Sequence, residues 1–157
     1  MTNKTVLWGL VSLIFLGLSM VFGIAFFGAH LMKDLDGARI EIKSPLDVNV
    51  QQTFNLEITV HNQRPSKALQ LTDLDLSEDY LKGFTVLEVT PSPKSNIRIP
   101  LENTRSYTFD IPIPPGKSQS FVYTLRAEKE GIFRGDVVAS EGLQFITEQA
   151  QTVVKKK

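Results

Sequence analysis

The feature that most constrains this chain is an apolar run near its N-terminus. The stretch from Val6 to Phe27 is almost wholly apolar and carries no charged residue. At about 1.5 Å per residue, a helix of this length covers the roughly 30 Å hydrocarbon core of a bilayer. Trp8 stands near one end of the run, where an amphipathic ring suits the membrane interface. We therefore predict a single transmembrane α-helix within residues 1–32, which anchors the chain in the bilayer of a cell membrane.

A cleaved secretory signal is the alternative explanation of this run. Signal peptides carry a shorter apolar region, of about 7–15 residues, and end at a small-x-small site. The tripeptide Gly23-Ile24-Ala25 fits such a site, but the apolar run continues beyond it through Phe26 and Phe27. The length of the run favours a retained anchor.

The charges that flank the run point both ways on sidedness. Lys4 precedes the run, while Lys33, Arg39 and Lys43 follow it, so a literal positive-inside count slightly favours a cytoplasmic domain. A short N-terminus before a hydrophobic helix is nevertheless the usual signal-anchor arrangement, in which the following domain is exported. We expect the C-terminal domain to be extracytoplasmic.

One face of the predicted helix carries small residues at a spacing of three and four. Gly9, Ser12, Ser19 and Gly23 share this face. Ser19 and Gly23 form a small-xxx-small pair, which lets two helix backbones approach closely in lipid. Small residues are also ordinary in membrane helices, so a face that contacts only lipid is an equal alternative. The hypothesis is a helix-packing face for other integral membrane subunits.

After the run, the pattern changes to the period of two that is typical of β-strands. From Thr53 to Asn62, apolar side chains alternate with polar ones, which gives one buried and one solvated face. The same alternation follows Ser106, Phe121 and Phe133. Weaker strands are predicted at 39–43, 69–76, 84–90 and 143–152, the last as an edge strand.

Turn signals rich in Pro and Gly separate these strands, and no stretch after the apolar run has a helical pattern. A change of phase near Thr72 predicts a β-bulge. Seven to nine short strands at regular spacing favour an all-β, antiparallel, immunoglobulin-like sandwich. We assign it to residues 39–154, with a short juxtamembrane linker at 33–38 and a basic tail at 155–157.

Three motifs carry a resemblance to a known group of domains. A strand ends in Val60-His61-Asn62, a Pro-Gly turn lies within Asp110 to Ser118, and a hairpin runs from Glu130 to Val137. Together they resemble the Ig-like sandwich domains of bacterial envelope proteins, including the CARDB-type cell-adhesion-related domains. The resemblance covers about Ile40 to Val153. It implies the fold and a cell-envelope setting, and it implies no ligand.

Composition and motifs argue against several classes of function. The chain has 17 basic and 17 acidic side chains, which gives no electrostatic case for nucleic acid. It has no cysteine, so a disulfide, a thiol nucleophile and a Cys-based zinc site are impossible. Its two histidines, His30 and His61, lack metal-ligand spacing, and neither a Gly-x-Ser-x-Gly elbow nor a phosphate loop occurs. We predict no enzyme activity, no cofactor and no small-molecule substrate.

The acidic stretch from Asp73 to Asp79 is the best candidate for a metal site. Its Asp-x-Asp start resembles a calcium loop, because hard cations prefer carboxylate oxygens. An EF-hand loop would need Gly at its sixth position and Glu at its twelfth, where this chain has Glu78 and Phe84. A solvated turn between two strands is the plainer interpretation, and we predict no metal.

Two functional hypotheses follow. The first is an accessory or structural subunit of a larger membrane complex, which the extramembrane sandwich braces. It is favoured because about ten residues separate Ala29 from the first strand at Arg39, whereas long-range adhesion uses stalks and repeats. The alternative is an autonomous, surface-displayed adhesion module for protein or glycan, for which Tyr80 is the one aromatic expected to be exposed.

The packing-face hypothesis predicts the effect of a single substitution. Gly23→Leu places bulk where two helix backbones would meet, so association of the anchor helices should weaken while the β domain stays folded. Crosslinking in membranes, with circular dichroism as the control for folding, measures both. Unchanged association would remove the hypothesis.

Overall fold

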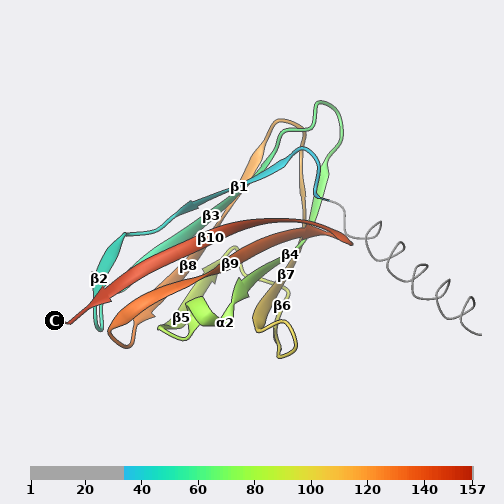
Figure 1. Ribbon diagram of the computed structural model, residues 1–157. Helices are drawn as coiled ribbons and strands as arrows, with labels where there is room; N and C mark the ends of the chain where they lie inside the picture. The colour runs from blue at the N-terminus through green and yellow to red at the C-terminus, as the bar shows by residue number, and fades with distance from the viewer. Residues whose placement is uncertain (1–33, 157) are drawn as a thin grey trace, which may run out of the picture. The chain divides into compact units, whose positions relative to one another are not determined.

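Ten strands form within residues 34–156, the part of the chain that the computed structural model describes, and the longer ones alternate apolar and polar residues. The strands stack as two sheets (Figure 1). The smaller sheet contains, in spatial order, β1 (Ala38–Lys43), β3 (Thr53–Asn62), β8 (Ser118–Ala127) and β5 (Phe84–Thr90). The larger sheet contains, in spatial order, β2 (Asp47–Asn49), β10 (Gln144–Lys155), β9 (Gly131–Glu141), β4 (Leu69–Ser77), β7 (Thr104–Ile113) and β6 (Ser95–Ile99).

Neighbouring strands run antiparallel, apart from β2, which pairs parallel to β10. The predicted all-β sandwich is therefore confirmed, and the expectation of purely antiparallel pairing is wrong at one pair. The last strand, β10, was expected at an edge. It has β9 on one side, and on the other its C-terminal end is covered by β2.

The core lies between the sheets and is held by aromatic pairs that join them. Tyr107 of β7 meets Tyr123 of β8 with ring centroids 5.0 Å apart, and Phe109 meets Phe121 at 4.5 Å. All four side chains are buried, and burial of one large apolar side chain contributes about 1.5–3 kcal/mol. The inward positions of β3 are filled by Phe54, Leu56, Ile58 and Val60.

The bulge predicted near Thr72 is confirmed. The register of β4 against β7 shifts between Leu71 and Asp73. Before the shift Leu71 faces the core, and after it Leu74 takes over that direction. The hydroxyl of Thr72 donates to the backbone carbonyl of Ser140 at 2.9 Å, which gives the displaced residue a partner on β9.

The first described residues tie the two sheets together. Asp34 forms a parallel bridge to Phe145, and Leu35 is 2% exposed and donates its amide to the Phe145 carbonyl at 3.0 Å. The chain then crosses to the smaller sheet as β1 and returns to β10 as β2. Residues 34–38, expected in a linker, are thus packed on the sandwich because Leu35 is apolar and finds the core.

Three short elements have no periodic signal in the sequence. β2 and β6 contain only three and five residues. The helix α2 (Glu78–Leu81) is a single turn whose N-cap, Ser77, accepts a hydrogen bond from the amide of Asp79 at 3.1 Å. A basic tail was expected at 155–157. Lys155 is not part of it, because this residue ends β10 and its ammonium group pairs with Asp47.

The predicted transmembrane helix at 1–32 lies outside the described residues. Between residues 34 and 156, no helix is long and apolar enough to cross a membrane.

Candidate functional site at the N-terminal end of the sandwich

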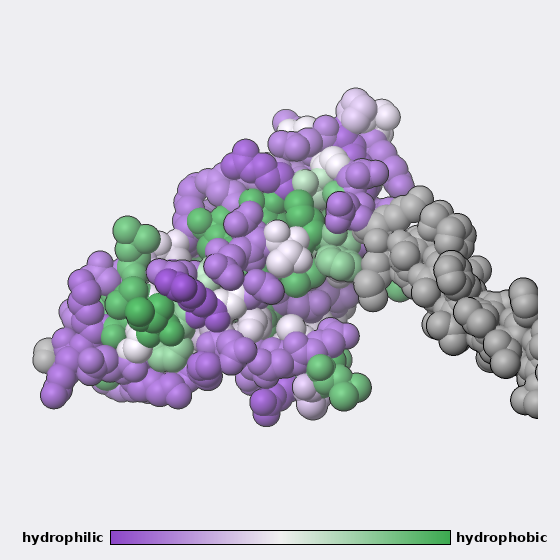
Figure 2. All heavy atoms as spheres, in the orientation of Figure 1, coloured by the Kyte–Doolittle hydropathy of each residue, from purple (hydrophilic) through white to green (hydrophobic). Residues whose placement is uncertain are grey.

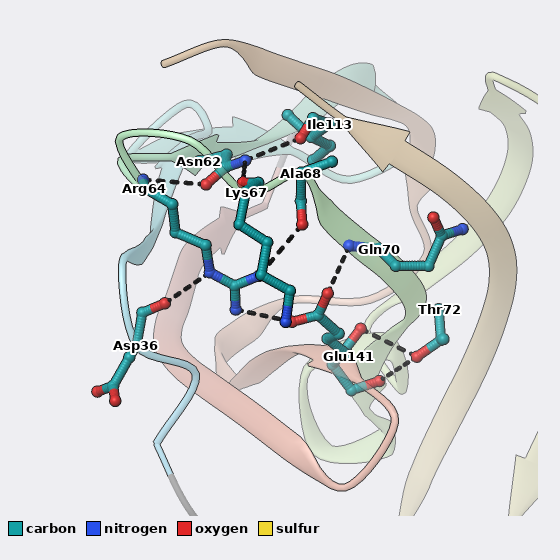
Figure 3. A network of polar contacts seen from close by, with 10 residues as sticks. Asp36, Asn62, Arg64, Lys67, Ala68, Gln70, Thr72, Ile113 and Glu141 are labelled. Carbon is teal, nitrogen blue, oxygen red and sulfur yellow. Dashed lines mark hydrogen bonds and ion pairs between the residues drawn. The ribbon is translucent and has the colours of Figure 1, made fainter. Parts of the chain in front are cut away.

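Four connecting segments meet at the end of the sandwich where the described chain begins. They are the leading segment (34–37), the β3–β4 loop (63–68), the β7–β8 turn (114–117) and the tip of the β9–β10 hairpin (142–143). Figure 3 shows Arg64 of the β3–β4 loop reaching the backbone carbonyl of Asp36 in the leading segment and the carboxylate of Glu141 at the end of β9. The described chain enters the sandwich at this end, and the contacts there fix its first residues to both sheets. We therefore take this end as the candidate site.

Asn62 is the most buried polar residue of this end, at 1% exposed. Its amide nitrogen donates to the carbonyls of Lys67 at 2.9 Å and Ile113 at 2.8 Å, and its amide oxygen accepts from the backbone N–H of Arg64 at 3.0 Å. One side chain therefore satisfies three backbone groups, two in the β3–β4 loop and one at the end of β7. A buried side-chain amide whose hydrogen bonds are all made is stabilising. Removal of the Asn62 side chain would leave each of its three backbone partners without that hydrogen bond.

Arg64 extends from the β3–β4 loop across to two other segments. Its Nε donates to the carbonyl of Asp36 at 3.0 Å, and another guanidinium nitrogen donates to the carbonyl of Ala68 at 3.3 Å. A third nitrogen is 2.7 Å from the carboxylate of Glu141 at the end of β9. The two charged side chains are only 12% and 16% exposed. We call Asn62, Arg64 and Glu141 the polar clamp.

Gly37 gives the arginine room to reach the leading segment. Its φ of +71° lies in the left-handed region, and a Cβ built there would stand 2.7 Å from Cγ of Arg64. The carbonyl of Gly37 also accepts the amide of Gln63 at 2.7 Å. A side chain at this position would strain the backbone and push Arg64 away.

The electrostatics of the clamp favour the ionised form of Glu141. Burial acts to raise the pKa of this carboxyl, but the hydrogen bonds from Arg64 and the Gln70 amide, with the charges of Arg64 and Lys67, outweigh it. The net effect is a pKa below the usual glutamate value. The carboxylate accepts from Gln70 at 2.7 Å through its second oxygen, so both oxygens have a partner.

Sequence reasoning did not single out the clamp. Arg64 and Glu141 stood in stretches interpreted only as turn signals, and Asn62 as the end of a strand. The predicted order and direction of the strands could have brought Arg64 and Glu141 to attention. In an antiparallel sandwich the β3–β4 loop and the β9–β10 hairpin belong to the same end, so opposite charges there are candidates for pairing.

The predicted helix-packing residues Gly9, Ser12, Ser19 and Gly23 lie outside the described residues. Their role stays a prediction.

The acidic stretch from Asp73 to Asp79 is not a turn, because Asp73 and Asp75 lie on β4 and the rest begins α2. Most of these carboxylates have partners: Asp73 accepts from the Thr108 hydroxyl at 2.7 Å, and Glu78 pairs with Arg105. Burial raises the pKa of Asp75, with a partial offset from a Ser106 hydrogen bond. Among residues 34–156 no group of three or more His, Asp or Glu side chains could hold a metal ion.

Tyr80 was expected to be exposed, and this expectation is wrong. The residue is 1% exposed, and its hydroxyl lies 3.0 Å from the hydroxyl of Thr152 on β10. The helical turn α2 folds its ring against Phe84, with centroids 5.0 Å apart. It belongs to the core, which removes the one aromatic proposed for a binding platform.

The outer face of the smaller sheet brings a serine, a histidine and a glutamate together. The Ser118 hydroxyl is 2.7 Å from Nδ1 of His61, and Nε2 of His61 is 3.4 Å from Glu41. They are cross-strand neighbours: His61 pairs directly with Ser118, and Glu41 stands on the adjoining β1. Ser118 is exposed at the start of β8 and does not line any of the described cavities. Nucleophilic catalysis also requires hydrogen-bond donors that point at the developing oxyanion. In a sheet, the backbone N–H groups of a strand point at the neighbouring strands instead.

The surface of the sandwich is mostly hydrophilic on the face that Figure 2 shows, with apolar side chains gathered in separate patches. Ile42 of β1 and Ile146 of β10 pack against the core while partly exposed. A depression of about 510 Å³ is lined by the leading segment and by Phe145, Ile146 and Thr147.

Comparison with known proteins shows the fold. No family model matches the chain, and no curated protein matches its sequence. Among solved structures, the chain is similar to the cohesin module of a family 33 glycoside hydrolase from Clostridium perfringens, with a TM-score of 0.55 and 10% identity over 76% of this chain and 98% of that one.

The chain is also similar to a CARDB domain from Pyrococcus furiosus that was solved in complex with di-metal ions. The TM-score is 0.51 and the identity 13%, over 75% of this chain and 87% of that domain. A third similar structure is AvmM, which catalyses macrocyclization in alchivemycin A biosynthesis, at a TM-score of 0.50 and 13% identity over 80% and 92%. At these identities the likeness shows the Ig-like sandwich fold alone, and at that level the resemblance to CARDB domains is confirmed.

The lowered pKa of Glu141 predicts how stability depends on pH. A carboxyl whose folded pKa is depressed contributes stability above its unfolded pKa, about 4.3, and that contribution is lost as the pH falls through the folded pKa. Glu141→Gln should therefore cost about 1.5–3 kcal/mol in the free energy of unfolding at pH 7, the value of a hydrogen bond to a charged group. The difference from the parent should shrink below pH 4.

Urea unfolding of fragment 34–157 at several pH values measures this difference. The exposed Glu88 on β5 provides a matched control, Glu88→Gln, for which we expect the same stability as the parent at pH 7. An E141Q variant as stable as E88Q would show that the charge of Glu141 contributes nothing to stability.

Proposed function

We propose that this chain is a non-catalytic, single-pass membrane protein whose extracytoplasmic sandwich braces a larger membrane complex as an accessory subunit. The apolar run at Val6–Phe27 supports the anchor, because its length matches the hydrocarbon core. In this role the chain lies in a cell membrane, and its partners are other integral membrane proteins.

The observation that carries the proposal is the lack of slack before the domain. Asp34 is already bridged to β10 and Leu35 is buried, so only six residues separate Phe27 from the sandwich. Fully extended, the seven steps from Phe27 to Asp34 span at most about 25 Å. A domain held this closely is suited to supporting neighbours at the membrane surface and unsuited to reaching distant ligands.

The polar clamp adds stiffness at the same place. Arg64 binds the carbonyl of Asp36 in the leading segment and the carboxylate of Glu141 in the hairpin. Because each contact comes from a different segment, the leading segment cannot peel from the sandwich without breaking several hydrogen bonds. A leading segment fixed to the sandwich in this way adds no slack of its own between anchor and domain, which suits a brace.

The side of the sandwich formed by β5 and β6 offers a surface for a partner. Both are edge strands, and edge strands present unpaired backbone groups. Leu87 of β5 is 47% exposed, Ile97 of β6 is 59% exposed, and Leu101 in the next turn is fully exposed. Apolar side chains along such edges suit a protein neighbour better than open solvent.

The alternative, an autonomous adhesion module for protein or glycan, has less support. Sugar-binding surfaces typically present aromatic rings, and among the described residues Phe145, at 37%, is the one aromatic with more than a third of its surface exposed. The described cavities are shallow surface depressions. The likeness to a cohesin module extends to the fold and supports no particular ligand.

The test is co-purification from native membranes in mild detergent through a C-terminal tag. We expect integral membrane proteins to be recovered with the chain in reproducible, stoichiometric amounts. A variant with six Gly-Ser residues inserted between Lys33 and Asp34 keeps the anchor and the sandwich but adds slack, and should recover several-fold less of the same proteins.

The matched control carries the same six residues after Lys157, where they add length without slack, and should behave like the parent. Recovery of the chain alone would contradict the accessory-subunit proposal and favour the autonomous module. Equal recovery by both insertion variants would contradict the role of the stiff attachment.

A further inference from the structure

We propose that the tip of the β9–β10 hairpin, Leu143 together with Phe145, rests in the surface of the lipid bilayer and gives the domain a second contact with the membrane. The inference rests on the proposed function, because it requires the chain to be anchored in that bilayer. It concerns a surface of the folded domain, and the partner it commits to is lipid.

The tip presents apolar side chains where a soluble hairpin usually presents polar ones. Leu143 is 70% exposed and Phe145 is 37% exposed, although both belong to a well-paired hairpin. Gly142 turns the chain with a φ of +62°, which leaves Leu143 at the extremity of the loop. Leucine and phenylalanine on a protruding tip lose contact with water when they enter the interfacial layer of a membrane.

The charges around the tip do not oppose this placement. Glu141, which starts the turn, is paired with Arg64 and is mostly covered. Two exposed carboxylates of the same end, Asp34 and Asp36, are matched by two exposed ammonium groups, Lys67 and Lys117. An end with balanced charge and an apolar tip can approach a lipid headgroup layer without net repulsion.

The path of the chain brings this end to the membrane. Phe145 is the residue bridged to Asp34, and Asp34 follows the apolar run by seven residues. That distance is about 10 Å if the intervening chain is helical and about 25 Å if it is extended. The opposite end of β10, at Lys155, lies ten residues further along the strand, or roughly 33 Å away. With at most about 25 Å of chain after the apolar run, the hairpin tip is within reach of a bilayer that holds that run.

The far end of the sandwich carries a comparable residue that serves as a control. Leu46 is 82% exposed and precedes β2, where its carbonyl accepts the amide of Val153 near the end of β10. It matches Leu143 in residue type and in exposure. Leu46 and Leu143 lie at opposite ends of the sandwich. A label at position 143 should therefore contact lipid, whereas a label at position 46 should not.

The absence of cysteine in the chain permits a direct test with single cysteine variants. Leu143→Cys, Gln149→Cys in the middle of β10 and Leu46→Cys are each labelled with a small environment-sensitive fluorophore. Q149C provides an intermediate position that is also exposed. The full-length variants are reconstituted into vesicles of phosphatidylcholine with one-fifth phosphatidylglycerol, with and without lipids brominated on the upper acyl chain.

We expect bromolipid to quench the label at position 143 at least threefold more strongly than the label at position 46, with position 149 close to position 46. Melting curves of the three variants, equal to that of the parent, establish that each domain is folded. Equal, weak quenching at 143 and 46 in chains that resist carbonate extraction would overturn the hairpin contact and leave the anchored accessory subunit standing. Extraction of the chains by carbonate would overturn both.

Discussion

A buried polar group must find partners, and at the N-terminal end of this sandwich that requirement is met by Asn62. Its amide joins the β3–β4 loop to the end of β7, and its backbone exchanges hydrogen bonds with the β7–β8 turn at Gly116 and Lys117. Removing the side chain would leave the carbonyls of Lys67 and Ile113 without this donor. The arrangement of the β3–β4 loop and the β7–β8 turn therefore depends on one residue at the end of the core strand β3.

Arg64 follows from that arrangement, because its own backbone amide is held by Asn62 two residues earlier. With its backbone fixed, its guanidinium reaches the leading segment and Glu141 at once. The partly buried ion pair is favourable because additional hydrogen bonds satisfy both charges, which an isolated buried pair would lack. The consequence is mechanical: the first described residues are held to the sandwich by hydrogen bonds with both Arg64 and Phe145.

Sequence periodicity was sufficient for the long elements. Thr53–Asn62 was predicted with the bounds that the structure has, and the change of phase at Thr72 located the bulge. Elements shorter than two periods, such as β2 and α2, carry no periodic signal, and the burial of Tyr80 followed from a helical turn that the pattern could not indicate. The clamp was missed for another reason: Arg64 and Glu141 are 77 residues apart, and only the topology brings them together.

The most direct test of the account is hydrogen exchange at single residues of the full-length chain. The amides of Leu35 and Gln63 donate to Phe145 and Gly37, the contacts that fix the leading segment to the sandwich. The account predicts that both exchange as slowly as the amide of Ile58 in the core strand β3, through unfolding of the whole domain. Exchange of Leu35 and Gln63 at the rate of unprotected amides, with Ile58 still protected, would show that the leading segment is free and would contradict the stiff attachment.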